Sequence, residues 1–411
     1  MFRWIAAGWL CAILAAGTAV TASALTPPAG PDKTALAAYV GPILDLSPTV
    51  AAARAEVDAA KARNAGARLW RENPEVEVDF EDAEVQTKTV GISQQIEWFP
   101  KPSTRGRASD RRLDAARADL ADARQRLLAD LLSALVEVDQ RRLIEAVAAR
   151  NAEAMHRLAD LSEKFRRAGD ISASEEQASH VAASRADIAL QSTRVSLSEA
   201  EQTLSEIAGM PEAPRLSFNG LPPAPFSTDE IEIDSLPKVT AVRLRQEAAD
   251  TDVKTAKWNR IPDPTIGLRW GEEGNDNLFG VRVSIPIPVL NSGRAEVDAA
   301  RADAVSATAR LDATRRAVQA RLRETARRYT ALHASQALWQ GKGLVALSEQ
   351  SALLERRLLA GDIPTIEYLV QLQQLYEVET ASLELRGQVW TAWFELLETA
   401  GKIEAWVGVE R

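Results

Sequence analysis

The residues that could bind a metal ion or carry out catalysis are few. Glu153 and His156 are three residues apart, the spacing at which a helix offers a carboxylate and an imidazole to one metal ion. A di-iron helix site needs a second Glu-x-x-His pair, and the sequence contains none. His180 and His333 stand alone in helical stretches, where we expect surface positions. Nucleophile-elbow, P-loop, zinc-protease and dinucleotide-binding patterns are missing from the sequence, so we expect no enzyme, no cofactor and no metal site.

The composition excludes further classes of protein. The 411 residues include 3 histidines and 1 cysteine and carry a formal net charge of −9. An acidic chain is a poor partner for nucleic acid, and one cysteine cannot build a disulfide scaffold. Met155 and Met210 are too few to form a ladder of soft-metal ligands. We interpret Trp390, Trp393 and Phe394 as helix packing and not as a ligand cage.

Residues 1–24 have the pattern of a secretory signal peptide. Arg3 is followed by an apolar run, and Ala22-Ser23-Ala24 is a small-x-small cleavage pattern. A single membrane anchor is the alternative, for which the run is short. Cys11 lies inside this segment and lacks the small residue expected before a lipid-modified cysteine. We therefore expect an exported chain that has neither disulfides nor a lipid anchor.

The chain contains an internal duplication. Ala168-Gly169-Asp170-Ile171 recurs as Ala360-Gly361-Asp362-Ile363, and Asn73-Pro74 recurs as Asp263-Pro264. We also match Val90-Gly91-Ile92 with Phe279-Gly280-Val281. These landmarks predict two tandem repeats. The predicted organisation is an N-terminal segment over 25–47, repeats over 48–209 and 237–401, a proline-rich linker over 210–236 between them, and a short C-terminal tail over 402–411.

Each repeat is predicted to be mostly helical with a small β part. We expect four elements in each copy: an opening helix (49–72 in the first copy, 238–259 in the second), a strand pair with period-two alternation (about 75–98 and 265–289), a long helix (104–168 and 293–360) and a returning helix (172–208 and 365–400). The opening and returning helices together match the long helix in length, so they could stack end to end along it.

The strands alternate between an apolar and a polar face. The first strand places Glu75, Glu77, Asp79 and Glu81 on one face, which suits an outer-membrane barrel with acids inside. The tryptophans at the helix side of the hairpins would form an interface belt; they are Trp70, Trp98 and Trp258. Four strands cannot close a sheet in lipid, so a barrel requires several chains. The alternative is a soluble α+β protein whose hairpins cap a helical bundle.

These landmarks resemble the TolC family of outer membrane efflux proteins, and within it the CzcC-like branch of heavy-metal and cation efflux. The stretches that carry the resemblance are Asn73-Pro74-Glu75-Val76, Val90–Glu97, Ile261–Leu268, Val283–Asn291 and Ala400-Gly401. The resemblance implies a homotrimer with a 12-stranded β-barrel in outer-membrane lipid and an α-helical tunnel in the periplasm. It also implies an exit duct for heavy-metal cations, with a periplasmic adaptor protein and an inner-membrane RND-type pump as partners.

The resemblance assigns roles to two sets of residues. The periplasmic tips that contact the adaptor would be Gly169, Asp170 and Ile171 in the first repeat and Gly361, Asp362 and Ile363 in the second. The barrel lumen would hold Glu75, Glu77, Asp79, Glu81, Glu97, Arg269 and Arg282. Two alternatives stay open: a periplasmic coiled-coil adaptor or structural protein, and a TolC-like duct for drugs or other small molecules. One hairpin in each repeat favours a duct over an adaptor.

Overall fold

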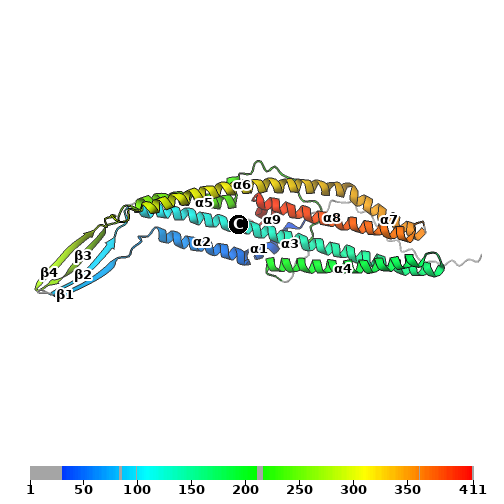
Figure 1. The fold of residues 1–411 in the computed structure, drawn as a ribbon, viewed down its shortest axis with the longest axis horizontal. Helices are drawn as coiled ribbons and strands as arrows, with labels where there is room; N and C mark the ends of the chain where they lie inside the picture. The colour runs from blue at the N-terminus through cyan, green and yellow to red at the C-terminus, as the bar shows by residue number, and fades with distance from the viewer. Residues whose placement is uncertain (1–29, 83–85, 99, 211–215, 361, 410–411) are drawn as a thin grey trace, which may run out of the picture.

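The protein is long and thin, with a small sheet at one end and helices over the rest of its length (Figure 1). The computed structural model describes residues 30–82, 86–98, 100–210, 216–360 and 362–409, so the predicted signal peptide lies outside the described residues. The elements are, in order, α1 (Lys33–Leu46), α2 (Pro48–Ala67), β1 (Glu75–Asp82), β2 (Gln86–Gln95), α3 (Lys101–Ala168), α4 (Ala173–Ala208), a 3-10 turn (Ile233–Ser235), α5 (Pro237–Asn259), β3 (Thr265–Glu273), β4 (Asp276–Ser284), α6 (Arg294–Leu338), a π-helical turn (Trp339–Gly343), α7 (Leu344–Ala360), α8 (Thr365–Thr399) and α9 (Ile403–Val407).

The predicted fold class, a duplicated unit that is mostly helical with a small β part, is confirmed. In the first unit α2 leads into the β1–β2 hairpin, α3 is the long helix, and α4 returns along it. In the second unit α5, the β3–β4 hairpin, α6 with α7, and α8 take the same places. Figure 1 shows α2 and α4 lying one after the other along α3, as their summed length suggested. The long helix α3 also packs against α5 and α8, so the two units share one helical body.

The second long helix differs from the expected single helix over 293–360. It is interrupted by the π-helical turn Trp339–Gly343 and continues as α7. A β-carbon at position 343 would lie 2.1 Å from the Trp339 ring, so only glycine leaves room for that ring. Glycine also weakens a helix interior, and the turn contains a second one, Gly341. Figure 1 shows the helix path bending where α6 gives way to α7.

The four strands form one antiparallel sheet in the order β1-β2-β3-β4. Both hairpins are shorter than the sequence suggested, because β2 ends at Gln95 and β4 at Ser284. Pro286 and Pro288 lie just beyond Ile285 and cannot donate ladder hydrogen bonds, which accounts for the early end of β4.

The sheet register corrects one of the repeat landmarks. Val78 lies opposite Val90 in the first hairpin. Val78 and Leu268 are equivalent, since each is four residues beyond the proline of its Asx-Pro pair. Leu268 lies opposite Val281 in the second hairpin. Val281 is therefore the structural counterpart of Val90, and the match of Val90 with Phe279 is wrong by two residues. The second hairpin carries one extra residue between its matched strands, which sequence similarity alone did not reveal.

The core lies at the middle of the helical body, where α8 carries a cluster of aromatic side chains. Trp390 and Phe394 are fully buried, and the edge of the Phe218 ring packs against both. Trp390 Nε1 donates to the Gly220 carbonyl oxygen at 3.3 Å, and the Tyr329 hydroxyl donates to the Pro223 carbonyl oxygen at 2.5 Å. These aromatic residues therefore hold part of the linker on the helices, as packing residues do.

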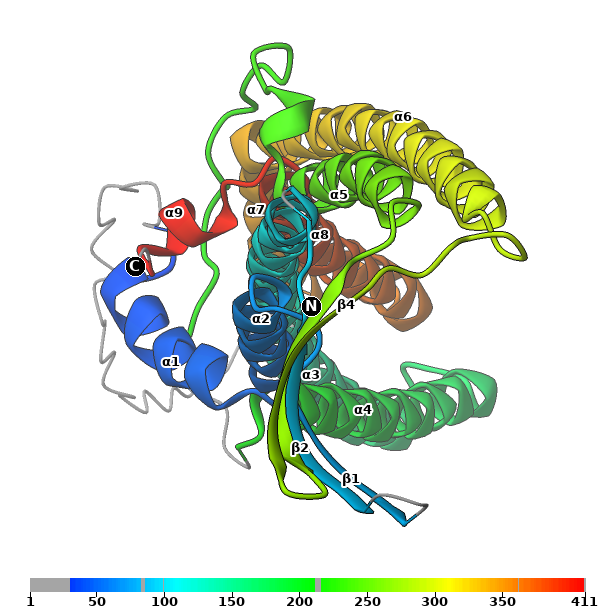
Figure 2. The ribbon, with the colours of Figure 1, turned by 90° about the vertical axis from the view of Figure 1, so that its left-hand side faces the viewer.

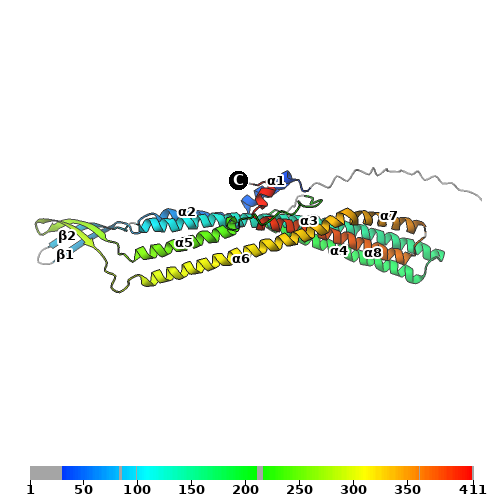
Figure 3. The ribbon, with the colours of Figure 1, turned by 90° about the horizontal axis from the view of Figure 1, so that it is seen from above.

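The segments at both ends of the described chain meet at this level. Helices α1 and α9 contact each other and lie together on one side of the long helices (Figures 2 and 3). Lys33 of α1 places its ammonium 5.1 Å from the centre of the Trp406 ring of α9. Within the described residues we find no single helix that is long and apolar enough to cross a membrane; α1 and α2 pass that test only as a pair bent by 53°.

Candidate functional site

The acidic row predicted on the first strand lies on one face of the sheet. Glu75, Glu77, Asp79 and Glu81 alternate along β1 with Val76, Val78 and Phe80, so the two sets point to opposite faces. The neighbouring strand supports the acids with hydroxyls. Ser93 Oγ donates to Glu77 at 3.4 Å, and Thr89 Oγ1 lies 3.5 Å from the Asp79 carboxylate.

The register carries this polar face across all four strands. Gly91 lies opposite both Glu77 and Arg269, and Gly267 lies opposite Arg282, so both arginines share the face of the acids. Arg282 Nη1 reaches Glu77 Oε2 at 3.2 Å across β2 and β3, where small residues leave room for it. Both side chains are about half exposed, so the stabilisation from this pair is small. Glu273 and Asp276 pair with each other at the far end of this face.

Glu97 lies beyond the end of β2 and not on this face. Its carboxylate is nearly buried and accepts two hydrogen bonds from Arg105, at 2.8 and 2.9 Å. Arg105 also donates to the carbonyl oxygens of Ala67 and Leu69, at the end of α2. The hydrogen bonds that Arg105 donates to Glu97 raise the pKa of Arg105. Glu97 therefore fastens the hairpin to the start of α3, a role that alternation of polar residues could not predict.

A second joint, which the sequence did not reveal to us, connects the two repeats. Lys101 Nζ lies 2.8 Å from Asp263 Oδ1 and donates to the Ile261 carbonyl oxygen at 2.5 Å. The same Asp263 oxygen accepts the backbone N–H of Trp98 at 3.0 Å. Lys101 lies between two prolines, and Asp263 comes just before a proline. These neighbours predict turns at both positions, but they do not predict that the two side chains meet.

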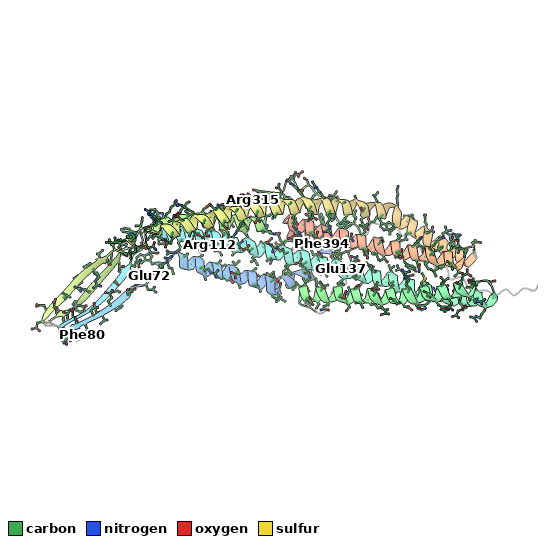
Figure 4. All side chains as sticks on the ribbon, in the orientation of Figure 1. Glu72, Phe80, Arg112, Glu137, Arg315 and Phe394 are labelled. Atoms are coloured by element: carbon green, nitrogen blue, oxygen red, sulfur yellow. The ribbon has the colours of Figure 1, made fainter. Side chains whose placement is uncertain are left out.

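The three tryptophans lie where the sheet meets the helices. Trp70 follows α2, Trp98 follows β2, and Trp258 is near the end of α5. All three side chains are exposed in the single chain, and Trp98 Nε1 donates to the Pro262 carbonyl oxygen at 2.7 Å. Figure 4 shows the extent of the neighbouring sheet, with Glu72 at its helix end and Phe80 towards its far end. Aromatic rings at one level beside an apolar sheet face are typical of a membrane interface.

The predicted tips lie at the opposite end of the molecule. Gly169 has φ = 85° and ends α3. Its N–H donates to the Arg166 carbonyl oxygen, and the Asp170 N–H donates to the Phe165 carbonyl oxygen. This is the left-handed helix end that glycine favours. Asp170 is exposed and Ile171 partly so, and Ser172 and Glu175 form a capping box that starts α4.

The second tip has the same hydrogen bond but a different surface. The N–H of Asp362 bonds to the Arg357 carbonyl oxygen at 2.9 Å; Gly361 itself lies outside the described residues. Asp362 is exposed, whereas Ile363 is buried in a cluster with Leu354 and Leu372. In the single chain, Ile363 therefore supports the tip from inside and Asp362 offers the exposed surface.

The Glu-x-x-His spacing and His180 have ordinary surface contacts, whereas His333 is partly buried, with Nε2 3.2 Å from the Pro222 carbonyl oxygen of the linker. Glu153 pairs with Arg157 at 2.7 Å, and His156 Nε2 lies 3.0 Å from Asp187. His180 lies 3.6 Å from Glu163. Over the described ranges, no three His, Cys, Asp or Glu side chains gather closely enough to hold a metal ion.

The fold is that of a class of solved outer membrane proteins. Solved structures of this class cover about nine-tenths of the chain. They include the outer membrane protein VceC from Vibrio cholerae (17% identity, covering 90% of this chain and 96% of that one, TM-score 0.74) and the Campylobacter jejuni CmeC outer membrane channel (11%, 92% and 89%, TM-score 0.78). CusC, described with transmembrane channel formation, is a further one (13%, 90% and 91%, TM-score 0.75).

The sequence comparisons match part of the chain to a protein family and to two relatives. Residues 232–402 match the outer membrane efflux protein family. The cobalt-zinc-cadmium resistance protein CzcC of Cupriavidus metallidurans is 28% identical over 259 residues, 59% of this chain and 60% of that protein. The outer membrane efflux protein BepC of Brucella suis is 24% identical over 337 residues, 78% of this chain and 73% of that one. The second repeat is therefore similar to the outer membrane efflux protein family over nearly its whole length.

Proposed function

We propose that the protein is the exit duct of a tripartite efflux pump and works as a homotrimer. The observation that carries this is the exposed apolar face of an open sheet. Val78, Phe80, Phe279 and Val281 are each more than 60% exposed in the single chain. Such a face suits lipid, and in lipid the free edges of β1 and β4 must pair with other strands. Three copies would close twelve strands, with the acidic face inside.

The partners of such a duct would meet it at the helical tips. A periplasmic adaptor would contact the exposed surfaces around Gly169 and Asp170 of the first tip and Asp362 of the second, and an RND-type pump would deliver the substrate from the inner membrane. What supports this is position: the tips are at the end of the molecule farthest from the sheet (Figure 1). A periplasmic adaptor of a different fold, our first alternative, would not need a sheet with a lipid-facing side.

We infer that the substrates are heavy-metal cations. The strand residues of the polar face include six acids (Glu75, Glu77, Asp79, Glu81, Glu273 and Asp276) and two arginines (Arg269 and Arg282), a net −4 for each chain and −12 for three. A ring of one sign concentrates ions of the opposite sign in a pore. The similarity to CzcC points the same way. The duct would conduct metals without selecting them, since the described residues hold no cluster of metal ligands.

A deletion strain tests this function. Cells that lack the protein should become sensitive to divalent metal salts and should retain more metal, and the cloned gene should restore both. If the deletion instead sensitises cells to drugs or other small organic molecules alone, the duct serves the second alternative substrate class. Recovery of the protein in the soluble periplasmic fraction, with no heat-dependent change in gel mobility, would favour the adaptor and contradict the duct.

A further inference from the structure

The charge of the chain changes sign where the sheet joins the helices. Four segments lie there, at the helix ends of the strands (Figure 1): residues 68–74, 96–107, 254–263 and 285–296. They hold nine basic and four acidic residues, a net charge of +5 in a chain whose total is −9. We call these four segments the basic collar. It contrasts with the acidic polar face of the sheet beside it.

The acids of the basic collar leave most of its bases unpaired. Glu97 and Asp263 are both used by the joints described above. Glu296 accepts a hydrogen bond from Asn291 Nδ2 at 3.1 Å. Within the part of the chain that the structure describes, the exposed collar bases that form no ion pair are Arg71, Arg107, Lys254, Lys257, Arg260 and Arg294. Glu72 is the one collar acid among these residues whose side chain has no partner.

Exposed tryptophans lie among these bases at the end of both opening helices. Trp70 is followed directly by Arg71, and Trp258 has Lys257 before it and Arg260 two residues after it. Both rings are exposed. A tryptophan ring favours the headgroup level of a membrane, and basic side chains near a membrane surface attract anionic headgroups. The combination suits a lipid headgroup better than a soluble anion, which would have no use for the exposed ring.

In the second repeat the collar holds an arginine ready to bind a phosphate. Arg260 Nε donates to the Ser292 carbonyl oxygen at 3.0 Å, so the side chain from the end of α5 lies beside the start of α6. A β-carbon at Gly293 would lie 2.8 Å from Arg260 Cγ, so the two segments are in close contact. Among the described residues the Nη groups of Arg260 have no partner. A guanidinium fixed in this way can donate to phosphate oxygens.

We propose that the basic collar binds the headgroups of anionic phospholipids in the leaflet on the helix side of the membrane. The lipid phosphate accepts hydrogen bonds from Arg260 and Arg294, and the Trp258 ring lies at the level of the lipid glycerol. This inference rests on the proposed placement of the sheet in lipid, and it does not depend on how many copies assemble.

Net negative charge is what distinguishes this headgroup from a zwitterionic one. A zwitterionic lipid carries an ammonium group beside its phosphate, which the collar cations repel. The far end of the sheet offers no such site, because its strand ends carry the acids Glu81, Asp82, Glu273 and Asp276 against Lys88. The charge of the chain therefore favours anionic lipid at the collar alone.

Quenching of tryptophan fluorescence by brominated lipid tests the preference. The protein is placed in vesicles that contain phosphatidylcholine and phosphatidylglycerol in equal amounts, with bromine on only one of the two lipids. Exchanging the brominated lipid shows which headgroup is enriched beside the exposed rings. The collar variant carries Lys257→Gln, Arg260→Gln and Arg294→Gln. A second variant, with Lys257→Gln and Arg294→Gln only, keeps the hydrogen bond from Arg260 to Ser292 and guards against local unfolding.

The matched control removes the same charge from exposed bases elsewhere on α6. These bases form no ion pair among the described residues, and the substitutions are Arg310→Gln, Arg323→Gln and Arg327→Gln. Arg310 is roughly 24 Å along the helix from Arg294, which exceeds the screening length of about 10 Å at 0.1 M salt.

We expect brominated phosphatidylglycerol to quench the unmodified protein and the control variant more strongly than brominated phosphatidylcholine does. The collar variant should lose this difference, and the double variant should lose part of it. Equal quenching of the unmodified protein by the two lipids, an undiminished preference in the collar variant, or the same loss in the control variant overturns the collar. If neither lipid quenches the protein, the sheet does not lie in lipid and the proposed duct is wrong too.

Discussion

Lys101 and Asp263 form a nearly buried ion pair, 2.8 Å between Nζ and Oδ1, that connects the start of α3 in the first repeat to the start of β3 in the second. The side chains are 3% and 12% exposed, and the lysine also donates to a backbone carbonyl oxygen. The pair lies at the point where the sheet leaves the helices. It therefore connects the sheet to the helical body.

We expect Lys101→Met to destabilise the protein by about 3–5 kcal/mol, because it leaves the Asp263 carboxylate buried without its partner. The matched control is Lys101→Ser combined with Asp263→Asn, which makes both members of the pair neutral and should lose much less. Thermal unfolding of the detergent-solubilised protein measures both. Equal losses in the single and the double variant would show that the ion pair is unimportant.

Gly169→Val should impair export while membrane insertion stays normal. Gly169 has φ = 85°, and a β-branched residue is strained there by roughly 1–2 kcal/mol, so the turn between α3 and α4 must rearrange. Gly169→Asn is the control, because asparagine tolerates this conformation. Metal retention in cells and cross-linking to the adaptor measure the effect. Normal export by the valine variant would show that the geometry of this tip is not needed for export.

The acidic face should make the open pore prefer cations. Replacing Glu75, Glu77, Asp79 and Glu81 by their amides removes four of the six acids of each chain and should lower the cation preference in planar bilayers. Raising the salt concentration should weaken the preference of the unmodified protein in the same way. Glu272→Gln is the control, since its register position is on the opposite face. An anion-selective pore, or one indifferent to the four changes, would argue against this role of the face.

Glu398 should make stability depend on pH. Burial raises the pKa of Glu398 above its ordinary value, although the charge of Arg321 opposes the shift. The folded protein then holds this proton more tightly than the unfolded chain. The resulting stabilisation is present in acid, below the ordinary pKa of about 4.5, and is lost as the pH rises through the raised pKa.

We therefore expect Glu398→Gln to flatten the fall in melting temperature on going from pH 4.5 towards neutrality. Glu384→Gln, at an exposed position on the same helix, should leave the pH profile unchanged. Parallel profiles for all three proteins would show that Glu398 does not govern this dependence.

The features that the sequence predicted correctly depend on local pattern. The alternation from Glu75 to Glu81 predicted the two faces of β1, and the glycine at 169 predicted the end of α3. Both follow from the period of a strand and from the conformational freedom of glycine. They need no knowledge of distant contacts.

The features that were missed depend on contacts between distant segments. Glu97 looked like one more acid of the polar face, yet Arg105 draws it into the joint with the helices. At the π-helical turn the Trp339 ring lies over Gly343, and Ile363 is buried by packing beneath the second tip. The correct repeat register appeared only when the strands were paired.

The most direct test of the account is the mass of the protein extracted from the outer membrane in mild detergent without heating. A four-stranded sheet with one apolar face and two open edges must be completed by other copies if it lies in lipid. The account predicts a mass of three chains, which falls to one chain on heating with a change in gel mobility. A stable single chain extracted from the outer membrane would contradict it.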